Sequence, residues 1–111
     1  MPGRFVSPAL AVTDATRSDS LPGVPAAAEF VPGYEAYLWD AVGAPAKTPM
    51  EIIDELNKAI NTVLADPTIK AQFASLGAEP MLMTPAELGI YITSEIEKWG
   101  RVVKTARIKA D

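Results

Sequence analysis

The spacing of apolar side chains changes at about residue 47. From there on, apolar residues recur every three or four positions, which is typical of helices that bury one face. Three such stretches follow one another, and each begins at a proline preceded by a residue that caps helix N-termini. The three pairs are Thr48-Pro49, Asp66-Pro67 and Thr84-Pro85. The pattern therefore predicts three helices in this part of the chain.

The first and third of these helix starts carry a further signal. A glutamate stands three residues after each threonine, at Glu51 and Glu87, which completes the capping-box pattern. The first helix is expected to bury one face, made of Ile53, Leu56, Ile60, Val63 and Leu64. The last is expected to be the longest, with its apolar face made of Leu88, Ile92, Ile96, Trp99 and Val103. The middle helix is shorter and should end at Gly77, a natural left-handed terminator.

The first 33 residues have a different character. They hold five of the ten prolines and three of the seven glycines, a composition typical of extended segments and turns. Residues 9–12 form a short apolar run that predicts a buried strand, and residues 24–30 predict a short helix. We therefore divide the chain into two parts at this change of composition, residues 1–33 and residues 34–111.

The strongest strand pattern in the chain covers residues 34–42. Tyr34, Ala36 and Leu38 alternate with polar or aromatic neighbours, and Gly43 ends the run. A third short extended segment is expected at residues 79–83. The sequence therefore predicts an α/β fold: a small, partial three-layer unit with about three short strands and three to four helices.

Composition excludes several classes of function. The chain has no cysteine and no histidine, so zinc sites, thiol nucleophiles and histidine bases cannot form, and we expect neither an enzyme, a metal site nor a cofactor. The net charge is −4, and no cationic cluster precedes residue 98, which argues against nucleic-acid binding. No apolar run approaches the roughly 20 residues that span a bilayer. The start lacks a signal-peptide pattern, so the chain as written is expected to be cytoplasmic.

Charged clusters offer little chemistry. Two pairs of acidic residues lie on predicted helices: Asp54 with Glu55, and Glu95 with Glu97. Residues one or two positions apart on a helix point in different directions, so neither pair converges on a common site. We interpret them as solvated side chains. The basic residues from Lys98 onward are interpreted as the cationic end of the last helix.

One pair of residues is a candidate for a ligand site. Trp39 and Asp40 stand near the end of the predicted strand, just before a Gly-Ala-Pro loop. Ligands of open α/β sheets bind outside the carboxyl ends of strands, so these two side chains are the candidate wall of a pocket. The alternative interpretation of Trp39 is an ordinary core residue.

A series of short motifs occurs in unbroken order from residue 9 onward. It includes Leu10-Ala11-Val12-Thr13, Arg17-Ser18, Leu21-Pro22, Val24-Pro25, Ala28-Glu29, Pro32-Gly33-Tyr34-Glu35, Trp39, Ala44-Pro45-Ala46, Thr48-Pro49, Leu56-Asn57, Ile60-Asn61, Ala65-Asp66-Pro67, Leu76-Gly77-Ala78-Glu79-Pro80, Thr84-Pro85 and Trp99-Gly100. This pattern resembles the C-terminal portion of the Bug family, the extracytoplasmic solute receptors of tripartite tricarboxylate transporters.

The resemblance implies a two-lobed periplasmic binding-protein fold that closes over small carboxylates. It implies that residues 1–33 are a remnant of the second lobe and hinge, and that residues 34–111 are the crossover strand and the helices that complete the first lobe. Departures from the family pattern include Ala26, where a threonine cap is favoured, and positions around the crossover strand such as Leu38 and Asp40.

Two functions follow from these observations. The first is a truncated domain related to carboxylate receptors, without a complete ligand site. The alternative is a stand-alone interaction module with no small-molecule ligand. A partial sheet leaves an unpaired edge, so we expect a homodimer or larger oligomer formed through that edge.

Overall fold

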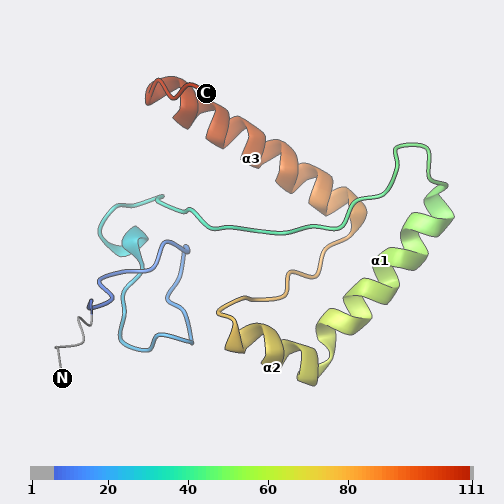
Figure 1. Ribbon diagram of the computed structural model, residues 1–111, viewed down its shortest axis with the longest axis horizontal. Helices are drawn as coiled ribbons and strands as arrows, with labels where there is room; N and C mark the ends of the chain where they lie inside the picture. The colour runs from blue at the N-terminus through green and yellow to red at the C-terminus, as the bar shows by residue number, and fades with distance from the viewer. Residues whose placement is uncertain (1–6, 111) are drawn as a thin grey trace. The chain divides into compact units, whose positions relative to one another are not determined.

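A computed structural model describes residues 7–110 of the chain (Figure 1). The elements are a short 3-10 helix, η1 (Ala27–Glu29), and three α-helices, α1 (Met50–Ala65), α2 (Pro67–Ser75) and α3 (Pro85–Thr105). The chain divides into two compact units, Met1–Gly43 and Ala44–Asp111. The first unit contains η1 and the extended segment 34–42, and the second contains the three α-helices.

The predicted strands do not form in residues 7–110. The run at residues 9–12 contributes a single parallel bridge, between Val12 and Ala26. Its two hydrogen bonds join Val12 N to Pro25 O at 2.9 Å and Ala27 N to Val12 O at 2.8 Å. The prediction of about three strands is therefore wrong for the described residues, whose regular secondary structure is helical.

The segment 34–42 is extended but belongs to no sheet. Two backbone hydrogen bonds join it to the rest of the first unit: Tyr34 N donates to Val31 O at 3.1 Å within a turn, and Ala36 N donates to Thr13 O at 2.9 Å. Alternation of side chains shows that a segment suits a strand, but a strand also needs a neighbouring backbone with free donors and acceptors. Leu38, on the alternating pattern, is 94% exposed, so no packed layer covers that side chain.

The predicted helix starts are correct at two of three positions. Asp66 Oδ1 accepts from Thr68 N at 2.8 Å and Ile69 N at 3.3 Å, and so caps α2. Thr84 and Glu87 form the expected capping box at the start of α3, with bonds of 3.1 Å and 3.2 Å. Because both motifs act within four residues, they need no tertiary partner.

The first helix starts one residue later than predicted. Pro49, not Thr48, is the N-cap of α1, and no side-chain hydrogen bond caps this end. The carbonyl oxygen of Pro49 accepts from Ile52 N and Ile53 N, while Thr48 N donates to Pro45 O in the preceding turn. Helix α2 ends as expected, since Gly77 has a φ of 73°.

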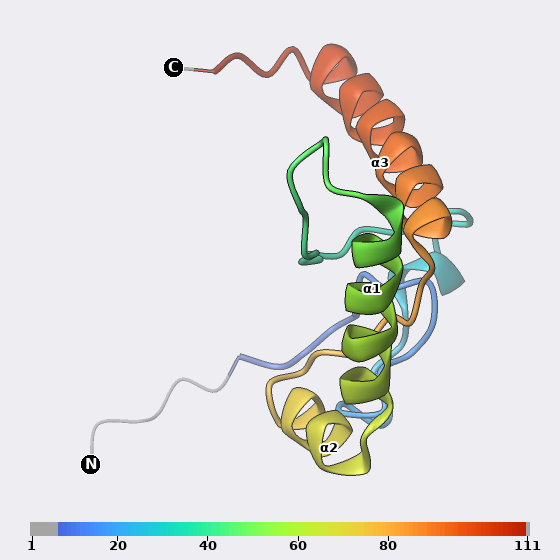
Figure 2. The same cartoon turned by 90° about the vertical axis from the view of Figure 1, so that its right-hand side faces the viewer.

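The connection between α2 and α3 is tied to α1. Asn57 Nδ2 and Asn61 Nδ2 both donate to the Met83 carbonyl oxygen, at 2.8 Å and 3.1 Å. The two side chains are also linked to each other, since Asn61 Nδ2 lies 3.3 Å from Asn57 Oδ1. We call this group of three residues the asparagine clamp. The clamp fixes the α2–α3 connection against α1 (Figure 2).

The apolar faces of the helices are only partly covered. No residue of α1 is buried, contrary to the expectation of a buried face, and Leu56 and Val63 are 47% and 52% exposed. On α3, Ile96 is 68% exposed. Ala26, at 1% exposure, is the only apolar residue of segment 7–110 that counts as buried. The helices are amphipathic as predicted, but contacts among the described residues leave much of their apolar surface exposed.

Candidate functional site

The two predicted site residues lie on the extended segment 34–42. Trp39 is half-buried and Asp40 is exposed. Both lie just before Gly43, as the sequence predicts, but the segment is not the end of a strand. Their proposed role as a pocket wall stays a prediction.

An ion pair organises the first unit, and it involves neither predicted residue. Arg17 Nε donates to Glu29 Oε2 at 2.9 Å, and Arg17 Nη2 donates to Glu29 Oε1 at 2.7 Å. Glu29 Oε2 also accepts from Ala26 N at 2.7 Å, which satisfies a backbone donor at the start of η1. The carboxylate thus joins the polar loop around Arg17 to the 3-10 helix through three hydrogen bonds.

These contacts shift the pKa values of both Arg17 and Glu29. The hydrogen bonds from Arg17 and from the Ala26 amide lower the pKa of Glu29 to about 2. The hydrogen bond and charge of Glu29 raise the pKa of Arg17. Because both side chains are well exposed, the pair defines the local geometry more than it adds stability.

The ion pair bears directly on ligand chemistry. Arg17 is the only lysine or arginine in residues 7–43, and its charge is paired with Glu29 through Nε and Nη2. A small carboxylate is bound most strongly by charge-assisted donors such as arginine. In the described part of the first unit, the one cation that could meet such a ligand is therefore already paired with a carboxylate.

Sequence reasoning noted both halves of this ion pair without pairing them. Arg17-Ser18 and Ala28-Glu29 were separate motifs, and Arg17 and Glu29 stand 12 positions apart. A local signal did exist: Glu29 stands three residues after Ala26, which is the spacing of a capping box whose first side chain is missing. That spacing predicts the bond to Ala26 N, but nothing in it predicts Arg17.

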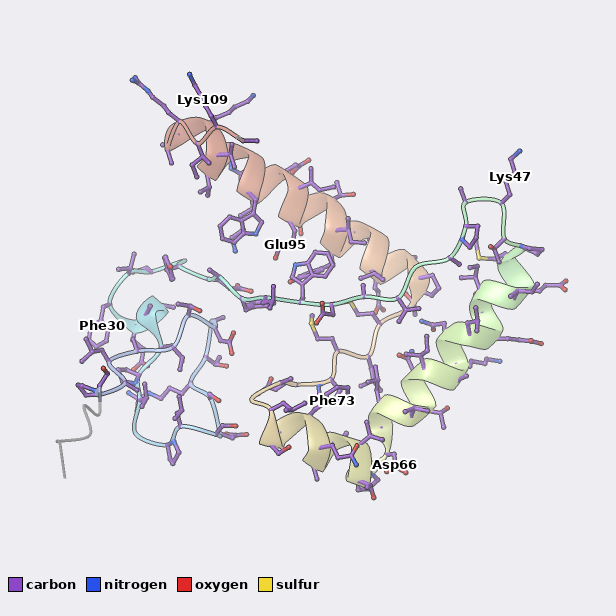
Figure 3. All side chains as sticks on the ribbon, in the orientation of Figure 1. Phe30, Lys47, Asp66, Phe73, Glu95 and Lys109 are labelled. Carbon is purple, nitrogen blue, oxygen red and sulfur yellow. The ribbon has the colours of Figure 1, made fainter. Side chains whose placement is uncertain are left out.

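Helix α3 holds a second polar pair. Trp99 Nε1 donates to Glu95 Oε2 at 2.7 Å, one helical turn away. Glu95, labelled on α3 in Figure 3, is only 9% exposed. Glu95 is therefore not the solvated residue that the sequence suggested. Lys98 Nζ lies 5.2 Å from the centroid of the Trp99 ring. Glu97 is exposed, so the two glutamates do not converge on a common site.

Other classes of site have no support in the described residues. Residues 7–110 contain no group of three or more acidic residues arranged to hold a metal ion. Within the same range, no helix combines the length and apolar character that crossing a membrane requires.

Comparison with known proteins gives a consistent result. Residues 3–108 match the family described as "Tripartite tricarboxylate transporter family receptor". The chain is 38% identical over 102 residues to Protein BugT of Bordetella pertussis, and covers 31% of that protein with 91% of its own length. It is 35% identical over 100 residues to a UPF0065 protein of Bordetella bronchiseptica, covering 30% of that protein with 90% of its own length.

A solved structure agrees with the sequence matches. The chain resembles R. palustris Rpa4515, determined with adipate, at a TM-score of 0.78 and 40% identity. The similarity covers 89% of this chain and 33% of the R. palustris chain. The chain thus spans about a third of the length of these proteins, which is consistent with the C-terminal portion indicated by its motifs. The resemblance is confirmed, and the chain belongs to the tripartite tricarboxylate transporter receptor family.

Proposed function

We propose that this chain forms part of a periplasmic receptor for a small carboxylate, with a dicarboxylate such as adipate as the first ligand to test. The observation that supports this most is its 40% identity to R. palustris Rpa4515, whose structure was solved with adipate. Binding, not catalysis, is the activity expected of a chain without histidine or cysteine.

The ligand site needs more than this chain. In the described part of the first unit, the one cation is held by Glu29, and Trp39 supplies an aromatic surface but no positive charge. We therefore expect the charge-assisted contacts to the ligand carboxylates to come from the two thirds of the receptor fold that this chain does not span. Residues 34–42 would contribute one wall, through Trp39.

The test is a chimera in which this chain replaces the matching third of the R. palustris protein. Adipate binding is measured by isothermal titration calorimetry for the chimera and for this chain alone. We expect the chimera to bind and the isolated chain to show no heat of binding. A chimera that folds, as judged by circular dichroism, but binds neither adipate nor other small dicarboxylates would contradict the proposal.

Two variants of the chimera test the site itself. Trp39→Ala is expected to weaken adipate binding at least about tenfold, since it removes the aromatic wall. Leu38→Ala is the matched control, because Leu38 is next to Trp39 in the sequence and its own side chain is 94% exposed. This variant should leave the affinity for adipate unchanged. Equal affinities for Trp39→Ala and the unsubstituted chimera would remove Trp39 from the site.

Self-association is a second candidate function, favoured by the amount of exposed surface. The accessible surface is 9516 Å², whereas two separate folded units of these lengths would expose about 7,000 Å². The sheet edge expected from sequence is not formed in residues 7–110, so apolar helix faces would carry the contact. Light scattering after size exclusion tests this: a monomer of 11.8 kDa across the accessible concentration range contradicts it.

A further inference from the structure

The end of α3 carries the densest positive charge in the chain. Residues 98–109 contain five of the ten lysines and arginines and no aspartate or glutamate. All fourteen acidic residues share the rest of the chain with the other five cations. The net charge is −4, so the chain is polarised, with one positive segment on a negative remainder. We call four of these cations the basic end of α3: Arg101, Lys104, Arg107 and Lys109.

The four side chains of the basic end are all exposed. Among residues 7–110, none of the four has an ion-pair partner. Figure 3 shows nitrogen-tipped side chains that project from the end of α3 where Lys109 is labelled. Lys98 is not counted, since its Nζ lies 5.2 Å from the centroid of the Trp99 ring. The basic end therefore presents four positive charges to whatever meets this surface.

The helix dipole explains only part of this charge. Its negative end attracts cations, but the effect falls off within the last turn. In the last turn of α3 the basic residue is Lys104. Arg101 lies one turn earlier, and Arg107 and Lys109 follow the end of the helix at Thr105. Three of the four cations therefore need another explanation.

Arg107 stands at a position that favours glycine. It directly follows the C-cap of α3 and has a φ of 54°. Hydrogen bonds from Arg107 N to Lys104 O at 3.2 Å and from Ile108 N to Val103 O at 3.0 Å close the turn. Helix α2 ends in the same kind of turn, but with Gly77 at that position, at a φ of 73°. Glycine adopts a positive φ without steric cost and arginine does not, so a retained cation here indicates a function.

We propose that the basic end of α3 binds an anionic phospholipid surface. Clustered lysines and arginines suit the diffuse negative charge of lipid headgroups, and each strengthens binding about fivefold. Ile108, which is 57% exposed, stands between Arg107 and Lys109. An exposed apolar side chain among cations is typical of segments that lie on a membrane surface. The proposal goes beyond carboxylate binding and does not depend on it.

A lipid surface fits the basic end better than an acidic protein surface does. Arginine recognises a protein carboxylate best through a fixed, bidentate pair, as Arg17 recognises Glu29. In the described chain, no such partner fixes Arg101 or Arg107. The chain also belongs to a family of transporter receptors, and a transporter lies in a lipid bilayer. The polarised charge would turn the basic end of such a receptor towards an anionic bilayer.

The test is co-sedimentation with sucrose-loaded vesicles, for this chain and for the R. palustris chimera, without adipate. Vesicles of phosphatidylcholine alone are compared with mixed vesicles that contain phosphatidylglycerol in equal amount. We expect both proteins to bind the mixed vesicles at least about 100-fold more tightly. Raising the ionic strength to about 1 M, where the screening length is about 3 Å, should abolish the difference.

Two triple variants of equal net charge locate the binding surface. We expect the first to bind mixed vesicles about 100-fold more weakly. It combines Arg101→Gln, Lys104→Gln and Lys109→Gln. The matched control removes three exposed lysines from other parts of the chain and should weaken binding less than about threefold. It combines Lys47→Gln, Lys58→Gln and Lys70→Gln.

Arg107→Gly separates binding from folding. We expect it to bind mixed vesicles about fivefold more weakly, while urea unfolding shows a chain at least as stable as the unsubstituted one. A purely structural role for Arg107 would not give that combination, because binding and stability would then change together.

Three results would overturn the proposal. One is an equal loss of binding in the two triple variants, and another is a folded chimera that does not bind mixed vesicles. The third is binding of the chain to poly-L-glutamic acid with no gain from phosphatidylglycerol, which would be expected of a nonlipid, acidic target if the polymer mimicked one, and the matching result with poly-L-lysine would show that charge sign is irrelevant. Adipate binding is measured separately, so failure of the ligand proposal and failure of this one give different results.

Discussion

The asparagine clamp is the clearest long-range contact in the second unit, and its contribution to stability can be predicted. Asn57 and Asn61 donate to the same Met83 carbonyl oxygen, at 2.8 Å and 3.1 Å, and all three residues are half-buried. A net hydrogen bond of this kind contributes about 0.5–1.5 kcal/mol. Replacing asparagine by alanine inside a helix returns up to about 0.7 kcal/mol of helix propensity. Each single alanine variant should therefore change the free energy of unfolding by less than about 1 kcal/mol.

The double variant should behave differently from the sum of the singles. In either single variant, the remaining asparagine still donates to Met83, so the α2–α3 connection stays attached to α1. Removing both donors releases it. We expect Asn57→Ala combined with Asn61→Ala to cost at least about 0.5 kcal/mol more than the two single effects added together, which is typical of residues that share a partner.

The assay is urea unfolding of the whole chain, followed by far-ultraviolet circular dichroism. Thr62→Ala is the matched control, because Thr62 is exposed on the same helix and its hydroxyl donates only within that helix, to Lys58 O at 2.8 Å. The control should be neutral or slightly stabilising. Strict additivity of the two asparagine substitutions, or a double variant as stable as Thr62→Ala, would refute the reasoning.

Three further predictions concern backbone conformation and titration. Gly77→Ala should destabilise the chain by about 1 kcal/mol in the same urea assay, because φ is 73° although the site has room for a Cβ atom; Gly89→Ala, inside α3, should have the opposite sign. Arg107→Gly should stabilise the end of α3 by up to about 1 kcal/mol, since Arg107 has a φ of 54°. The Glu29 carboxyl should titrate with a pKa of about 2 by NMR, so the stability contributed by its contacts is complete above about pH 4.5 and is lost as the pH falls through 2; Arg17→Leu should raise that pKa.

The features that the sequence predicted correctly are those that act over a few residues. The cap of Asp66, the capping box of Thr84 and Glu87, and the positive φ of Gly77 each depend on atoms within one turn of helix. The error at Thr48 is also local: the turn to Pro45 uses the Thr48 amide, and the helix begins one residue later.

The features that the sequence did not predict depend on residues far apart along the chain. Nothing in the spacing of Arg17 and Glu29 indicates that a bidentate ion pair joins them, and the asparagine clamp spans more than 20 positions. The strand expected at residues 34–42 failed for the same reason. Its side-chain pattern suits a sheet, but the described residues supply no neighbouring strand to pair with it.

These differences bear on how the helices are stabilised. Isolated helices shorter than about 12–15 residues are marginal in water, and even longer ones gain most of their stability from packing of the apolar face. Helix α2 has nine residues, and α1 has 16 with no residue buried. The cap at Asp66 therefore fixes where α1 ends and α2 begins, while the packing that stabilises the two helices has to involve exposed apolar side chains such as Leu56 and Val63. A chain with well-defined helix ends and uncovered helix faces is what one portion of a larger receptor fold should look like.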